Sequence, residues 1–170
     1  MQQAINLYIL TKSMNYMELR DKLLPNATPE RIANVLSKIK VIEDQIDKGE
    51  NVDKLIEEFN QYTGRLHDKY TFQHYWRSID IEHFARNAAQ PVPTKLDDIT
   101  KEELIEIVDR ICEADDNTDF YLEVFEVNVP HPHVSDLIYW PSNEGLPDDL
   151  SSEQIVEIAL NYKPKPPIIL

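Results

Sequence analysis

The sequence predicts an all-α protein with two parts. Apolar residues recur at spacings of three and four over most of the 170 residues, which is the period of a helix with one buried face. Ser or Thr stands where several of these helices would begin, and Gly or Pro stands where they would end. Because Pro91 and Pro93 coincide with a change in composition, we expect a helical N-terminal region over residues 1–92 and a second domain over 93–170.

The N-terminal region is predicted to hold a helical hairpin with an added helix. Apolar clusters within residues 1–24 predict one or two helices. Thr28-Pro29 starts the next helix, since Thr caps helices and Pro suits the first helical position, and its apolar face runs to Gly49. A further helix is expected over residues 52–64, and a short one over 81–88. No motif in this region indicates a chemical function.

The second domain is predicted to begin with a capped helix. Thr100 and Glu103 have the spacing of a capping box, and an apolar stripe follows as far as Ala114. Residues 115–119 then begin a second apolar element, which two prolines end near residue 130. The apolar spacing of this element fits a short helix or a strand, and periodicity alone does not decide between them.

A single helical turn and a last helix complete the second domain. The turn covers residues 135–139 and is stopped by Pro141. Ser151 and Gln154 form a second capping box, which opens a helix that runs to Tyr162. The proline-rich tail after it is expected to be irregular.

Most of the negative charge lies in the second domain. The formal net charge is −14, with 12 Lys and Arg against 13 Asp and Glu in residues 1–92, and 5 against 18 in residues 93–170. Such a surface repels nucleic acid, whose binding requires Lys and Arg to neutralise phosphates. It favours fast, salt-sensitive association with a basic partner. The alternative is a solvated acidic surface that only keeps the protein soluble.

Composition argues against several functional classes. The three glycines are scattered, which disfavours Gly-rich phosphate loops, and a single cysteine forms no intramolecular disulfide. No apolar run approaches the ~20 residues that span a bilayer. The apolar stretch in residues 1–24 has no basic region before it and no small-residue cleavage site after it. We therefore expect a cytoplasmic protein without a membrane partner.

No residue pattern predicts a catalytic, metal or cofactor site. His131 and His133 lie close together, but no third histidine or cysteine is near enough in sequence to complete a zinc site. Cys112 falls on the apolar side of its helix, near Val108 and Ile111, and is expected to be buried and inert. The many carboxylates form pairs on helix faces that look solvated, whereas acid–base catalysis needs a pair in a dry pocket. The protein is not expected to be an enzyme.

One stretch, residues 131–141, has the composition of a binding site. Asp136 stands near the start of the predicted turn, and Tyr139 and Trp140 are adjacent at its end. Adjacent aromatics on a one-turn helix cannot both point inward, so we expect at least one to be substantially exposed. Exposed Tyr and Trp beside an acid are typical of binding hot spots. The alternative is that Trp140 covers a small core while Tyr139 packs sideways.

Residues 95–165 resemble the immunity proteins of nuclease-type colicins and pyocins. The resemblance is carried by ITKEELIEIVDRICEAD at 99–115, HPHVSDLIYWP at 131–141, an acidic loop at 144–149 and SSEQIVEIALNYK at 151–163. It implies a four-helix bundle with a short third helix. It also implies binding to a cognate HNH-type DNase toxin next to the toxin's active site, which blocks access of DNA.

The resemblance further implies two sets of partner-binding residues. The shared hot spot of the third helix corresponds to Ser135, Asp136, Tyr139, Trp140 and Pro141, where Trp140 replaces a second tyrosine common in the family. The specificity helix corresponds to residues within 116–128, and the stretch between Cys112 and Ser135 is shorter than in familiar members by about one helical turn. The partner-facing positions expected there are Asp119, Leu122, Glu123 and Glu126.

The leading hypothesis is an immunity protein that inhibits a basic nuclease toxin and protects the cell that produces it. The alternative is an acidic protein-interaction adaptor whose main binding module is the N-terminal region. Residues 1–92 lie outside the resemblance.

Overall fold

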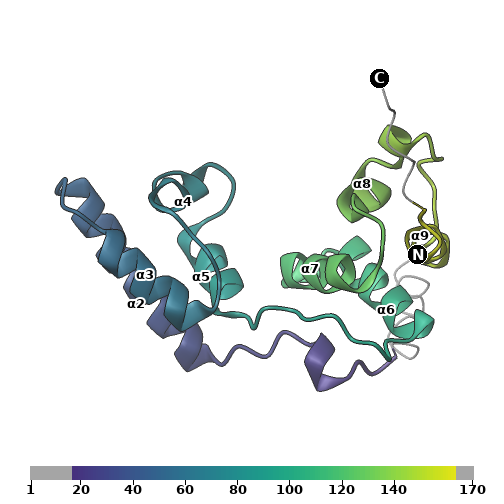
Figure 1. The fold of residues 1–170 in the computed structure, drawn as a ribbon, viewed down its shortest axis with the longest axis horizontal. Coiled ribbons are helices and arrows are strands. Elements are labelled where there is room, and N and C mark those ends of the chain that lie inside the picture. The colour runs from purple at the N-terminus through teal and green to yellow at the C-terminus, as the bar shows by residue number, and fades with distance from the viewer. Residues whose placement is uncertain (1–16, 164–170) are drawn as a thin grey trace, which may run out of the picture. The chain divides into compact units, whose positions relative to one another are not determined.

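A computed structural model describes residues 17–163, and the regular structure within them is helical (Figure 1). Eight α-helices, α2 to α9, and three short 3-10 helices, η1 to η3, lie in this described part of the chain. The predicted all-α class is confirmed. None of the described helices is long and apolar enough to cross a membrane. The chain forms two compact units: unit 1 combines residues 17–24 with 94–163, and unit 2 is Pro25–Pro93.

Unit 2 is a helical hairpin with shorter helices packed on it. Thr28 caps α2 (Pro29–Asp47), since its side chain accepts a hydrogen bond from the Arg31 backbone N–H, and Gly64 ends α3 (Asp53–Thr63) in the left-handed conformation. The unit continues with α4 (Lys69–His74), η2 (Tyr75–Arg77) and α5 (Ile81–Ala89). The sequence predicts α2, α3 and α5 close to these bounds. The core of the unit consists of Val35, Ile39, Ile42, Val52, Ile56, Phe59, Phe72, Phe84, Ala85, Ala88 and Ala89.

Unit 1 contains four helices, of which the third is short. They are α6 (Lys101–Cys112), α7 (Thr118–Asn128), α8 (Val134–Tyr139) and α9 (Ser152–Leu160), with η3 (Pro141–Glu144) after α8. Helix α6 packs against α7 and α9, and α8 contacts both of the same helices, so the four share one core. Both predicted capping boxes are present, one at the start of α6 and one at the start of α9. The element that the sequence leaves open as helix or strand is the helix α7.

Residues 17–24 pack with unit 1, although the sequence groups them with the rest of residues 1–92. Leu19 and Leu23 are buried in the same core as helices α6 to α9. The only regular structure in this segment is η1 (Asp21–Leu23). The helices expected further toward the N-terminus, and the tail after residue 163, lie outside the described residues. We call residues 17–24 the N-terminal segment below.

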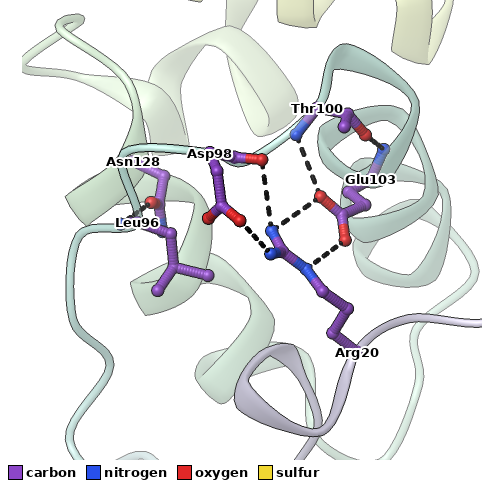
Figure 2. A network of polar contacts seen from close by, with 6 residues as sticks. All are labelled: Arg20, Leu96, Asp98, Thr100, Glu103 and Asn128. Carbon is purple, nitrogen blue, oxygen red and sulfur yellow. Dashed lines mark hydrogen bonds and ion pairs between the residues drawn. The ribbon is translucent and has the colours of Figure 1, made fainter.

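Arg20 joins the N-terminal segment to the start of α6 (Figure 2). Its Nε donates to Glu103 Oε1 at 2.7 Å and its Nη2 to Glu103 Oε2 at 3.0 Å, while Nη1 donates to Asp98 Oδ2 at 2.7 Å. Glu103 also accepts from the backbone N–H of Thr100, as the capping box requires. Burial raises the pKa of Glu103, but the bonds from Thr100 and Arg20 outweigh it and hold that pKa below its ordinary value.

Candidate partner-binding surface

Two adjacent aromatic side chains are exposed at the end of α8, where Tyr139 is the last helical residue and Trp140 is the C-cap. Val134 and Leu137 are buried and fix the inner face of this short helix against the core. Pro141 begins η3, and because proline has no backbone N–H, α8 does not continue through it. Tyr139 is 43% exposed and Trp140 is 58% exposed. Both rings therefore reach solvent, which excludes the alternative that Trp140 covers a small core.

The rings of Tyr139 and Trp140 lie against each other at the end of α8. The ring centroids of Tyr139 and Trp140 are 5.6 Å apart in an edge-to-face arrangement. Partial burial raises the pKa of the Tyr139 hydroxyl, and electrostatic interactions with Asp119 and Cys112 raise it further. Tyr139, like an ordinary tyrosine, keeps its proton at neutral pH and can donate a hydrogen bond to a partner.

The other three positions expected on this hot spot are less exposed. Ser135 and Asp136 are half-buried, and Pro141 is buried. The backbone carbonyl of Asp136 accepts a hydrogen bond from the Trp140 N–H at 2.9 Å, which fixes the end of the helix. Four of the five positions therefore reach the surface, and Pro141 acts on the site by ending α8.

Of the four positions expected on the specificity helix α7, Asp119, Glu123 and Glu126 reach the surface, whereas Leu122 packs against the core of unit 1. Asp119 and Glu126 are exposed, and Leu122 and Glu123 are half-buried. The inner side of α7 is formed by the buried residues Phe120, Tyr121, Val124, Phe125 and Asn128. Val127, which sequence reasoning does not assign to the site, is 37% exposed and follows Glu123 by one helical turn. The charge of Asp119, in the first turn of α7, contributes to the raised pKa of Tyr139.

The expectation that Cys112 is buried is wrong. Its side chain is exposed, whereas Ile111 before it is buried. Successive helical residues point about 100° apart, so the residue after a buried one turns out of the core at the end of α6. Cys112 thereby faces solvent at the end of α6.

A buried histidine orders the loop that leads into α8. The Nδ1 atom of His131 accepts a hydrogen bond from the His133 backbone N–H at 3.1 Å, and the ring packs edge-on against Tyr162 at 4.6 Å between centroids. Burial lowers the pKa of His131, so the neutral ring that can accept this bond is favoured. Among the described residues, no three His, Cys, Asp or Glu side chains are grouped so that they could hold a metal ion.

Exposed carboxylates lie on both sides of the aromatic pair in the sequence. They are Asp116, Asp119 and Glu126 on or before α7, and Glu144, Asp148 and Asp149 after α8. A surface with two exposed rings and several carboxylates is suited to a protein partner that presents Lys and Arg side chains.

Comparison with known proteins places this surface inside a matched region. A family model described as colicin immunity protein / pyocin immunity protein matches residues 96–165, which contain α6 to α9. The protein YezA of Bacillus subtilis (strain 168), itself described as uncharacterized, is 48% identical over 71 residues, which cover 40% of this chain and 97% of YezA. No solved structure matches the chain significantly.

Proposed function

The chain belongs to the colicin and pyocin immunity protein family through residues 96–165, and we propose that it inhibits a cognate nuclease toxin by binding it. In this proposal the toxin is a basic nuclease of the HNH-type DNase class, and the bound protein blocks the access of nucleic acid. The observation that carries the proposal is the short helix α8, which lies within the matched residues and exposes both Tyr139 and Trp140. The protein acts by binding and performs no catalytic step.

The construction of α8 supports its role as the main source of binding energy. Its inner face is anchored by Val134 and Leu137, and Pro141 ends it, so the two rings are carried on a short element with a fixed position. Aromatic side chains that are already ordered lose little conformational entropy on binding and bury a large area. The Tyr139 hydroxyl can in addition donate to a carbonyl or carboxylate of the partner.

The distribution of charge supports a basic partner. Residues 93–170 hold 18 Asp and Glu against 5 Lys and Arg, and the acids near α8 are exposed. A nuclease must attract a polyanion, and an acidic protein surface competes for the same Lys and Arg side chains. The exposed acids on the outer side of α7 would discriminate among toxins, because unmatched charges at an interface are costly.

The test is a binding and protection experiment with the toxin encoded beside this gene. The full-length chain should co-purify with the nuclease domain of that toxin and prevent it from cleaving plasmid DNA. Tyr139→Ala should lose both properties. Tyr62→Ala, which removes a comparably exposed tyrosine from α3 of unit 2, should retain them. Nuclease activity that persists at saturating wild-type protein would contradict the proposal.

A further inference from the structure

Unit 2 contains a pocket lined by acidic and aromatic side chains. Its volume is about 460 Å³, which lies in the range of pockets that take small ligands or single side chains. Helix α2 contributes Glu43 and Asp47, while α4 and η2 contribute Phe72, His74 and Trp76. The immunity family match, residues 96–165, does not include this unit.

Negative charge gathers at one side of the pocket. The Tyr75 hydroxyl donates to Glu43 Oε1 at 2.7 Å, which holds this carboxylate in place. Burial raises the pKa of Tyr75, and the hydrogen bond to Glu43 and the charges of Glu43, Glu82 and Asp80 raise it further. Three carboxylates therefore act on the same hydroxyl group. Asp47 adds an exposed carboxylate one turn along α2 from Glu43.

Aromatic rings form the other side of the pocket. Trp76 is 65% exposed, and its indole N–H donates to the Gln73 carbonyl oxygen at 2.7 Å, which fixes the orientation of the ring. The guanidinium of Arg77 lies 5.6 Å from the centre of the Trp76 ring, so this ring already attracts one cation. Tyr70, itself 61% exposed, stacks on His74 at 3.9 Å and extends the aromatic surface.

We propose that this pocket binds a Lys or Arg side chain from a basic segment of a partner protein. The cation would interact with the carboxylates of Glu43 and Asp47, and its alkyl stem or guanidinium would lie against Trp76. The exposed indole of Trp76 favours an organic cation, because its ring face can contact an alkyl stem or a guanidinium as well as the charge. This site would give unit 2 a binding role of its own. The proposal does not depend on whether α8 binds a nuclease.

The experiment follows the indole N–H signals of the full-length protein by NMR. The chain has two tryptophans, Trp76 and Trp140, so Trp140→Phe assigns the two signals. The probes are the capped tripeptides Gly-Arg-Gly and Gly-Lys-Gly, with Gly-norleucine-Gly as the uncharged control. The cationic tripeptides should shift the Trp76 signal saturably, and the norleucine tripeptide should leave it in place. An equal response to norleucine would mean an apolar occupant and would overturn the proposal, as would tighter binding of tetramethylammonium.

Two double variants separate the pocket from the general charge of unit 2. Glu43→Gln with Asp47→Asn should weaken binding of the arginine tripeptide roughly tenfold, because both charge-assisted contacts are lost. Asp53→Asn with Glu57→Gln removes the same charge from α3, outside the pocket, and should weaken it about twofold or less through screening. Asp47→Asn alone, at an exposed position, should show a smaller loss in the same direction without disturbing the fold. Equal losses in the two double variants would overturn the proposal.

Discussion

Tyr139 is the residue on which the proposed interaction depends most. Truncation to Ala should weaken toxin binding by about 2–4 kcal/mol, as loss of a hot-spot aromatic does. The same change should leave the melting temperature nearly unchanged, since the ring is exposed and α8 is anchored through Val134 and Leu137. Calorimetric titration measures the first effect and thermal melts the second.

Two outcomes of that experiment would remove Tyr139 from the hot spot. One is normal toxin binding by Tyr139→Ala, and the other is a loss of binding that accompanies unfolding. Tyr62→Ala, in unit 2, serves as the control for the removal of an exposed tyrosine.

Glu103 should make the stability of unit 1 depend on pH. Its pKa is held below the ordinary value of 4.5, so the folded state binds this proton more weakly than the unfolded state. Its stabilisation is complete above about pH 4.5 and is lost as the pH falls through the lower, folded pKa. Glu103→Gln should therefore flatten the decline of the free energy of unfolding in this acidic range, measured by urea denaturation.

Glu102 supplies the matched control for the pH experiment. It lies in the same first turn of α6 but is exposed. In Glu102→Gln, the free energy of unfolding should decline with falling pH as it does in the wild type. If the free energy of unfolding of Glu103→Gln declines in the same way, the pH dependence does not arise from the interaction of Glu103 with Arg20 and Thr100.

At the scale of elements, the sequence is informative where the determining contacts are local. The capping boxes at Thr100 and Ser151 involve residues three positions apart, and both are present as predicted. The class of α7 could not be decided in this way, because a short apolar element has too few residues to separate the two periods. Cys112 was misplaced because the apolar stripe of α6 ends at Ile111, and a pattern gives an end only to within a residue or two.

The same reasoning explains which parts of the candidate site could be predicted. Exposure of Tyr139 or Trp140 follows from their adjacency and the proline stop, which are local features. That Asp119 and Cys112 influence the pKa of Tyr139 depends on how three helices pack, and no spacing in the sequence indicates it.

Helix α7 should control preference among toxins more than general affinity. Glu126 is exposed on its outer side, where a partner's charge would face it. Glu126→Ala should cost less affinity than Tyr139→Ala, on the order of 1 kcal/mol or less for an exposed charge. Glu126→Ala should also reduce the difference in affinity between the cognate toxin and a related toxin, as measured by competition binding. A uniform loss for both toxins would place Glu126 outside the specificity surface.

At the scale of the whole molecule, the concentration of charge in residues 93–170 should govern the rate of association. Eighteen acidic residues against five basic ones create a field that attracts a basic toxin over several ångströms, and salt screens it. The association rate should fall steeply between low and high ionic strength, while the dissociation rate changes much less. Stopped-flow mixing measures both. An association rate that stays flat would reduce the acidic surface to a role in solvation.

The N-terminal segment changes what an isolated second domain is expected to do. From the sequence, residues 95–165 are expected to fold without residues 1–92, yet Leu19 and Leu23 belong to their core. Two leucines at this spacing give no signal of a contact with residues about eighty positions away, so the sequence could not reveal it. Leu23→Ala in the full chain should destabilise unit 1 by about 2–5 kcal/mol.

A melt that distinguishes the two units tests this contribution. Leu23→Ala should lower the transition of unit 1 and leave that of unit 2 unchanged. Leu66→Ala, at a position 95% exposed in unit 2, should alter neither. An unchanged unit 1 transition in Leu23→Ala would mean that the segment is not an integral part of that core.

The split construction of unit 1 also has a consequence for the order of synthesis. The ribosome makes the N-terminal segment before unit 2, and the helices that cover Leu19 and Leu23 come after unit 2. At roughly 5–20 residues per second, the chain from Leu24 to Leu160 takes on the order of ten seconds to emerge. During that time all of unit 2 is available to fold. Leu19 and Leu23 cannot yet be buried, because the helices α6 to α9 that cover them have not been synthesised. We therefore expect unit 2 to fold first during synthesis, and the N-terminal segment to fold afterwards together with helices α6 to α9.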